Sequence, residues 1–208
     1  MKAALVIGHE HLSQGARNVK FNLTEFNFNT RLVKKIIEEY KVRQRNTNII
    51  QKDIDVLELR EVYRTTYRDL PDILNNLDPD FTISFHANAF NNYTSGTETL
   101  YYHSSAFGLG IARIIQSNVV FHLGLRDRGI KPKHSEERGG YLLRYTNAPT
   151  VITEPFFIDN DIDCYIVKER FESLVDAYLL SLDEIQELFR RISWGIQEWF
   201  RVCFESCF

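Results

Sequence analysis

The hydrophobic positions of this chain fall into two kinds of segment, short continuous apolar runs and longer stretches with a helical period. The short runs are rich in β-branched and aromatic residues, which is typical of buried strands. They predict strands at residues 3–8, 81–85, 97–102, 141–145 and 150–154. Because these runs alternate with segments of helical period, we expect an α/β fold in which helices cover both faces of a sheet.

The longer segments repeat apolar residues about every 3.6 positions and are predicted as amphipathic helices. The first begins near Glu25 and carries its apolar face at Phe28, Leu32, Val33, Ile36, Ile37 and Tyr40. Further helices are expected at 58–77, 106–122 and 161–181. Pro71 lacks a backbone N–H and is expected to break the 58–77 segment into two pieces.

Two remaining segments give weaker signals. Residues 48–51 predict one more short strand. Residues 124–140 are polar, have no hydrophobic period and are predicted as a long loop. A loop of that length inside a compact domain is a mild indication of function.

Residues 183–208 differ from the rest, because they hold both tryptophans and form an aromatic-rich helical stripe. We expect a domain at residues 1–182 followed by a helical extension. The extension either packs on the domain, mediates self-association or partner binding, or lies weakly at a membrane interface. Its glutamates disfavour the membrane, and no run of about 18 apolar residues occurs, so stable membrane insertion is not expected.

Composition narrows the class of protein. A hydrophobic content of 44% and a charged content of 25% are ordinary for a soluble globular domain. A net charge of -3 argues against a nucleic-acid-binding protein, which is usually strongly basic. The 3 cysteines do not form a disulfide framework, and Cys203 and Cys207 alone do not make a metal site. The apolar start is too short for a signal peptide, so synthesis in the cytoplasm is expected.

Three predicted strands end at a histidine or a carboxylate. His9 follows residues 3–8, His86 follows residues 81–85, and Glu154 ends the last strand. Ligands bind just outside the carboxyl ends of strands in an open α/β sheet, so these side chains are expected to meet. Glu25 opens the first helix, which returns from the His9 loop, and is expected to join them.

This set fits a catalytic zinc site, which uses three protein ligands and leaves one position for water. We predict that His9, Glu25 and His86 hold one zinc ion and that Glu154 carries protons. Each residue taken singly is also compatible with an ordinary surface role. His11 is a rival ligand, because alternate residues share a face of a strand, but it lies beyond the apolar run and His9 is favoured.

The other three histidines have no matching partner and are expected to be structural or exposed. They are His103, His122 and His134. The chain lacks the helical His-Glu-x-x-His pattern and any Cys-x-x-Cys pair, so helix-borne protease zinc sites and zinc ribbons are unsupported.

At these residues the chain resembles the zinc-dependent N-acetylmuramoyl-L-alanine amidases of the amidase-3 type, in the short form found in phage endolysins. The resemblance covers roughly residues 3–180, and the motifs occur in the family's order. They are Ile7-Gly8-His9, Gln14-Gly15-Ala16, Leu23-Thr24-Glu25-Phe26, Ser84-Phe85-His86-Ala87-Asn88-Ala89, the run from Gly96 to Tyr102, Arg128-Gly129, Tyr141-Leu142-Leu143-Arg144 and Thr153-Glu154-Pro155-Phe156-Phe157, with Asn160 and Asp163.

The resemblance implies a mixed, mostly parallel sheet of about six strands, with zinc on His9, Glu25 and His86 and Glu154 as the catalytic glutamate. The implied reaction is hydrolysis of the amide between muramic acid and L-alanine in peptidoglycan. Asn88 either hydrogen-bonds the substrate or is a turn residue at a strand end. Glu98 is expected to be structural or to support the site from outside, because its strand lies away from the ligand ends.

Two departures from the family bear on substrate preference. Glu10-His11 follow the first histidine where glycines are frequent, and Pro155-Phe156-Phe157 follow the catalytic glutamate. The expected role is cell lysis, by a protein made in the cytoplasm and released to the wall through a separate membrane lesion. The alternatives are a zinc carboxypeptidase-like metallopeptidase and a catalytically inactive wall-binding protein.

Overall fold

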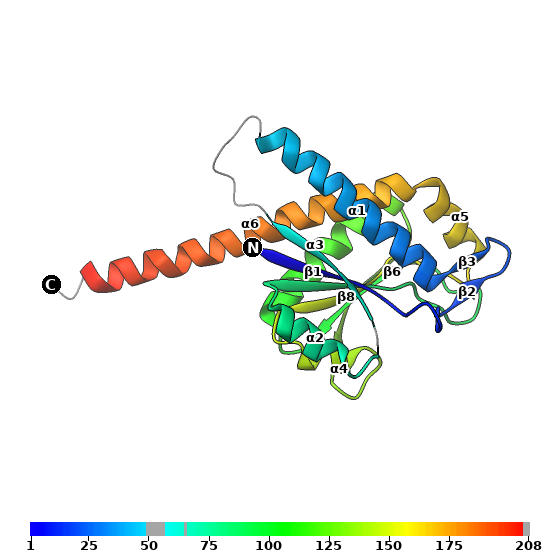
Figure 1. Cartoon of the computed structure of the whole chain (residues 1–208), viewed down its shortest axis with the longest axis horizontal. Coiled ribbons are helices and arrows are strands. Elements are labelled where there is room, and N and C mark those ends of the chain that lie inside the picture. The colour runs from blue at the N-terminus through cyan, green and yellow to red at the C-terminus, as the bar shows by residue number, and fades with distance from the viewer. Residues whose placement is uncertain (49–56, 65, 206–208) are drawn as a thin grey trace.

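A six-stranded mixed sheet forms the centre of this computed structural model, which describes residues 1–48, 57–64 and 66–205 (Figure 1). The strand order is β4-β1-β5-β8-β6-β7, and every neighbouring pair is parallel except β6 and β8. The strands are β1 (Lys2–Ile7), β4 (Glu58–Tyr63), β5 (Phe81–Phe85), β6 (Thr97–Tyr102), β7 (Asp127–Lys133) and β8 (Thr150–Glu154). The predicted α/β fold with a mixed, mostly parallel sheet is confirmed.

Helices form a layer on each face of the sheet (Figure 1). The larger layer holds α1 (Glu25–Asn48), α3 (Ala106–Leu123), α5 (Asp161–Glu169) and α6 (Phe171–Glu205). The smaller layer holds α2 (Leu70–Leu77) and α4 (Gly140–Tyr145). A separate two-stranded ribbon, β2 (Arg17–Asn18) with β3 (Leu23–Thr24), leads into α1.

The central strand β1 supplies side chains to both layers. Ala3, Leu5 and Ile7 are buried in the core beneath α1, α3 and α6, whereas Ala4 and Val6 belong to the smaller core beneath α2 and α4. Successive side chains of a strand point to opposite faces, so a strand covered on both faces must be apolar throughout. This arrangement explains the continuous apolar run from which the strand was predicted.

The prediction of a helix over residues 58–77 is wrong in its first part. Residues 58–63 form β4, an edge strand in which only Val62 is buried. An edge strand alternates irregularly between exposed and half-buried positions, and this pattern resembled a helical period. Pro71 lies in the first turn of α2, where the missing N–H costs nothing, so it begins a helix and does not break one.

Two further predictions are wrong near the other edge of the sheet. Residues 127–133, expected within a loop, form the edge strand β7, which has no fully buried position. Residues 141–145, expected as a strand, lie in the short helix α4, which buries Leu142 and Leu143. A short apolar run does not distinguish a strand from one helical turn. The predicted strand at 48–51 is not seen at Asn48, which ends α1, and residues 49–51 lie outside the described residues.

The helix predicted at 161–181 is two helices, α5 and α6, which meet at Arg170. The Arg170 guanidinium donates to the carbonyl oxygen of Leu123 at 2.8 Å and fixes this junction against α3. Helix α6 then continues across residue 182 to Glu205, and its last turns project beyond the sheet (Figure 1). The first part of the predicted stripe packs on the domain, because Ile185 is buried and the Phe189 ring lies 5.8 Å from that of Phe81. The side chains from residue 193 onward, including Cys203, and residue Cys207 lie outside the described residues.

One described helix, α3, is long and apolar enough to cross a membrane by length and composition alone. Its residues Ile111, Ile115 and Val119 are fully buried in the core of the larger layer. This burial identifies α3 as a core helix of the fold.

Candidate metal centre and active site

His9 leaves the end of β1 in a left-handed conformation, with φ of 67°. This conformation is uncommon for a residue with a side chain, and such strain is concentrated at functional sites. The Nε2 atom of His9 lies 3.1 Å from Oε2 of Glu25 but outside hydrogen-bond geometry, and it is buried without a hydrogen-bond partner among the described residues. A buried imidazole nitrogen with a free lone pair is suited to bind a metal.

Glu25 is the first residue of α1 and is only 1% exposed. Its carboxylate accepts one backbone hydrogen bond on each oxygen, from the N–H of Ala16 and of Ala87, both at 3.1 Å. Its Oε1 also lies 3.1 Å from Nδ1 of His86. These bonds hold the carboxylate between the two histidines.

The protonation states of this group suit metal binding. Burial acts to raise the pKa of Glu25, but the close approach of the His86 and His9 imidazoles outweighs burial and holds this pKa well below its usual range. Burial lowers the pKa of His86 below its ordinary value, partly opposed by Glu25. Glu25 is therefore ionised and His86 neutral, which are the forms that bind metals.

One ligand atom from each of His9, Glu25 and His86 lies within 4.8 Å of the other two. Tetrahedral zinc with bonds of about 2.0–2.2 Å separates its ligand atoms by about 3.4 Å, close to the 3.1 Å that separates Glu25 from each histidine. The residues present fit a zinc ion.

Two glycines allow the backbone to approach these side chains. A Cβ atom at Gly15, which has φ of +75°, would lie 2.6 Å from Oε2 of Glu25 and 2.7 Å from Cδ2 of His9. A Cβ atom at Gly8 would lie 2.6 Å from Cε1 of His86. Any larger residue at either position would displace a candidate ligand.

Glu154 ends β8 and is 7% exposed, at one end of a cavity that also contains His9 and His86. Burial, followed by the negative charge of Glu98, raises the pKa of Glu154 to about 8, although Arg138 opposes this change. A carboxyl group with a pKa near neutrality both accepts and returns a proton at physiological pH.

Glu98 lies directly opposite Glu154 in the antiparallel register of β6 and β8. Its carboxylate accepts hydrogen bonds from Nδ2 of Asn88 at 2.9 Å and from Nε of Arg128 at 2.7 Å. The Arg128 guanidinium in turn lies 4.9 Å from the centre of the Phe157 ring. The expectation that Glu98 lies away from the ligand ends is wrong, because β6 runs antiparallel to β8 and therefore begins at the edge where β8 ends.

Asn88 follows β5 and binds Glu98 through its side-chain amide, and its Oδ1 accepts from the N–H of Ala89. It is not part of the cavity wall formed by the described residues, and substrate binding by Asn88 stays a prediction. His11 is exposed, with its ring 6.2 Å from that of Phe26, and lies outside the metal-binding group.

The three other histidines are held by local contacts. The rings of His103 and His134 stack at 4.1 Å, and Nδ1 of His122 lies 2.8 Å from the carbonyl oxygen of Asn118. None of the three belongs to the metal-binding group found among the described residues.

The cavity has a volume of about 390 Å³ and opens on the face of the sheet that carries α2 and α4. Its floor is apolar and is formed by Val6, Leu100 and Ile152. Arg64 and Arg138 contribute to its wall, and neither was identified from the sequence, because each lies among other cations in a segment read as a helix or a loop.

Among solved structures, the chain resembles an N-acetylmuramoyl-L-alanine amidase from Clostridium difficile 630, with a TM-score of 0.71 at 22% identity, over 89% of this chain and 96% of that one. It also resembles the catalytic domain of the CD27L endolysin, which targets Clostridium difficile, with a TM-score of 0.67 at 22% identity, over 86% and 94% of the chains. These likenesses show a shared fold.

The curated relatives include an uncharacterized cell wall amidase of Bacillus anthracis, which is 36% identical over 92 residues, or 40% of this chain and 16% of that protein. N-acetylmuramoyl-L-alanine amidase LytC of Bacillus subtilis (strain 168) is 33% identical over 93 residues, or 43% and 18% of the two chains. This chain spans no more than half the length of the curated relatives reported. The sequence also matches the N-acetylmuramoyl-L-alanine amidase family, of the amidase-3 type, over residues 4–182, and the chain therefore belongs to this family, as its motifs predicted.

Proposed function

We propose that this protein is a zinc-dependent amidase that hydrolyses the bond between N-acetylmuramic acid and L-alanine in peptidoglycan. The observation that carries the proposal is the juxtaposition of His9, Glu25 and His86 with the buried carboxyl group of Glu154 in one cavity. Membership of the amidase family supports the substrate class.

His9, Glu25 and His86 would hold the metal, which, when bound, supplies a Lewis acid that polarises a carbonyl and acidifies water. Glu25 would contribute the single negative charge of the ligand set, since burial keeps His86 neutral. The backbone N–H groups of Ala16 and Ala87 keep this carboxylate oriented toward both histidines.

Glu154 would take a proton from the attacking water and give it to the departing amine of L-alanine. Its raised pKa suits both transfers, because a stronger base takes the first proton more readily and still releases it to an amine. Glu98, held by Asn88 and Arg128, keeps a negative charge beside Glu154 and sustains that basicity.

We further propose that the enzyme acts on the cell wall as a phage or prophage lysin after release from the cytoplasm. Its fold is shared with the catalytic domain of an endolysin, and 94% of that domain is covered. Lysis should then require a separate membrane lesion. Induced expression in a bacterial host should reduce turbidity only when a membrane-permeabilising agent is added.

The decisive experiment is mass spectrometry of soluble products from purified sacculi, treated with zinc-loaded protein with and without chelator. Chelator-sensitive release of stem peptides with a free L-alanine amine supports the proposal. The Glu154→Gln variant should bind zinc but lose at least about 100-fold in turnover, since a positioned acid–base residue contributes that much. The Glu172→Gln variant, changed at an exposed glutamate of α6, is the matched control and should retain wild-type turnover.

Other products would overturn the proposal. Single released amino acids would indicate a carboxypeptidase-like enzyme. Binding to sacculi that chelator does not affect, with no cleavage by the zinc-loaded protein, would indicate a wall-binding protein with an inactive site.

A further inference from the structure

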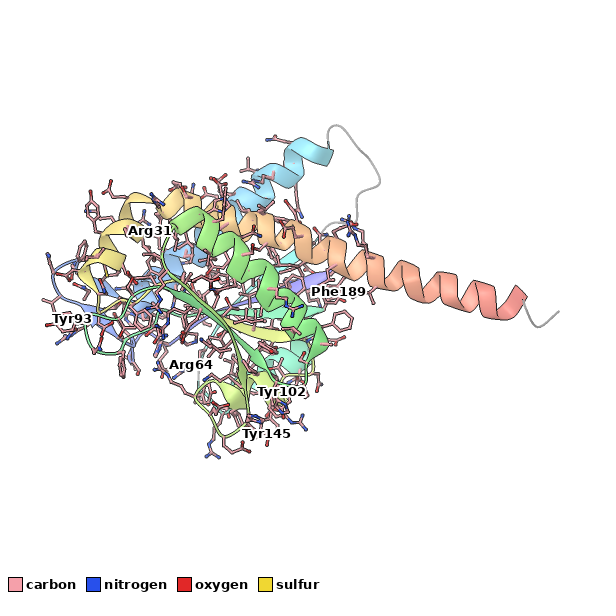
Figure 2. The ribbon with its side chains drawn as sticks, turned by 180° about the vertical axis from the view of Figure 1, so that it is seen from behind. Arg31, Arg64, Tyr93, Tyr102, Tyr145 and Phe189 are labelled. Carbon is pink, nitrogen blue, oxygen red and sulfur yellow. The ribbon has the colours of Figure 1, made fainter. Side chains whose placement is uncertain are left out.

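Two arginines line the candidate active-site cavity without an ion-pair partner among the described residues. Arg64 follows β4, and Arg138 precedes Gly139 in the segment that leads into α4. Figure 2 shows Arg64 on the side of the sheet away from α6, where Tyr145 of α4 also lies. Arg64 is half-buried and Arg138 is exposed at the rim of the cavity, and an anionic partner would stabilise a guanidinium that is partly removed from water.

The register of the sheet fixes the position of Arg64. Strands β1 and β4 run parallel with Ile7 opposite Tyr63, so Arg64 leaves the sheet beside the segment that carries His9. The Nε atom of Arg64 is buried and has no hydrogen-bond partner among the described residues. Its guanidinium carbon lies 5.6 Å from the centre of the Tyr67 ring, which restricts its orientation.

Close backbone packing fixes the chain next to Arg138, whose exposed side chain also lines the cavity. A Cβ atom on the adjacent Gly139 would lie 2.7 Å from Cδ1 of Ile152, so the chain passes directly over the cavity floor at this point. The charge of Arg138 is near enough to Glu154 to act against the raised pKa of that carboxyl group. Arg138 therefore lies within electrostatic reach of the reacting atoms.

The two carboxylates that precede Arg138 in the sequence make their contacts elsewhere. Glu137 accepts a hydrogen bond from the backbone N–H of His134 and pairs with Lys133 at 3.5 Å. Glu136 accepts from the hydroxyl of Ser135. The cavity wall thus keeps two available cations beside an apolar floor, which is a suitable site for a carboxylate attached to a small apolar unit.

The proposed substrate has one ionised group close to the scissile bond. On the sugar side the lactyl carboxyl is consumed in the amide, whereas on the peptide side L-alanine is followed by an acidic second residue. This residue is joined through its side chain, so its α-carboxylate is free unless the cell amidates it. From peptide dimensions, that carboxylate lies about 7 Å from the scissile carbonyl carbon.

We infer that Arg64 and Arg138 form a binding site for the free α-carboxylate of the second stem-peptide residue and make the enzyme selective for substrates that are not amidated there. This inference rests on the proposed function and specifies its substrate. A guanidinium group binds a carboxylate more strongly than a neutral amide. This difference is large enough to change kcat/KM by about 10-fold to 100-fold.

The test uses three synthetic N-acetylmuramoyl peptides and the zinc-loaded full chain. The first carries a free α-carboxylate on the second residue, the second carries an amide there, and the third keeps that carboxylate but has an amidated C-terminus. The wild-type enzyme should cleave the first and third equally and the second at least about 10-fold less efficiently. Comparison with the third peptide separates the α-carboxylate from the terminal carboxylate as the recognised group.

Variants assign the selectivity to the two arginines. Arg64→Gln and Arg138→Gln should each reduce the ratio of kcat/KM between the first and second peptides, mainly through KM for the first. Arg138→Lys, which keeps a charge, should restore part of the ratio. Arg144→Gln is the matched control, because Arg144 lies in α4 outside this cavity, and its ratio should stay at the wild-type value.

Three outcomes would overturn the inference and leave the amidase function intact. The first is equal cleavage of the first and second peptides. The second is reduced cleavage of the third peptide alone, which would identify the terminal carboxylate as the recognised group. The third is a preference for the first peptide over the second that neither arginine variant changes. Failure to cleave any of the three peptides, with sacculi also intact, would instead refute the proposed function and remove the basis of the inference.

Discussion

Burial of the Glu154 carboxyl group lowers the stability of the fold once this group must ionise. Its replacement by glutamine should therefore make the metal-free protein more stable at alkaline pH. In the folded chain, burial and the neighbouring charge of Glu98 raise the pKa of this carboxyl group from 4.5 to about 8. In the unfolded chain the group is exposed and titrates near its ordinary value. Between these two pH values the unfolded chain has released a proton that the folded chain still holds.

The sign follows from proton linkage. The unfolded state binds fewer protons than the folded state in this window, so the free energy of unfolding falls as pH rises from about 4.5 to about 8 and is constant above it. Each pKa unit corresponds to about 1.36 kcal/mol, which sets an upper limit of about 5 kcal/mol on the loss. Glutamine is neutral at every pH and does not incur this loss.

The assay is thermal or urea unfolding of chelator-treated protein, followed by circular dichroism from pH 5 to pH 8.5. Glu154→Gln should match the wild type near pH 5 and exceed it progressively toward pH 8, by several degrees in Tm, since about 1 kcal/mol shifts the Tm of a chain of this size by about 2–4 °C. Glu172→Gln, at an exposed position, should follow the wild-type curve throughout. A difference between Glu154→Gln and wild type that is the same at every pH would refute the linkage argument.

Other substitutions test the metal group and its supports. His86→Ala should lose bound zinc, measured by elemental analysis, and should destabilise the fold by about 1.5–3 kcal/mol in thermal melts, because Glu25 loses its hydrogen bond to His86. Gly15→Ala should weaken zinc binding at least about 10-fold, whereas Gly129→Ala, which has the same sign of φ but no atom within 4 Å of the added Cβ, should keep zinc in a competitive chelator titration. Asn160→Ala removes the oxygen that accepts from the N–H groups at the start of α5 and should lower stability by about 1–2 kcal/mol in urea unfolding, with the zinc content unchanged.

The sheet was predictable where a strand is covered on both faces. Strands β1, β5 and β8 are buried along nearly their whole length, and their sequences are short runs rich in apolar, β-branched and aromatic residues. The edge strands β4 and β7 carry exposed positions and have no such run, so they were read as a helix and a loop. Their identity depends on neighbours that the local sequence does not encode.

The residues of the candidate site also fall into those that local sequence predicts and those that it does not. His9 and His86 follow recognisable strands and Glu25 opens a clear helix, so their meeting at one edge followed from strand direction alone. Glu98 was misplaced, because local sequence does not reveal that β6 runs antiparallel to β8. Arg64 and Arg138 were missed, since only tertiary packing brings a residue after an edge strand and a residue before α4 to the same cavity.

The reversed direction of β6 also determines which connections can vary without harm. In a wholly parallel sheet, every segment that precedes a strand lies on the edge remote from the chemistry. Here the segment that precedes β6 reaches the edge where β8 ends, because Glu98 pairs with Glu154. Insertions before Thr97 would therefore extend the rim of the active site, whereas insertions after Tyr102 would enlarge the remote edge. Variation at residues 91–95 should therefore alter the substrate range. Residues 103–105 lie at the remote edge and should accept tags or groups for surface immobilisation.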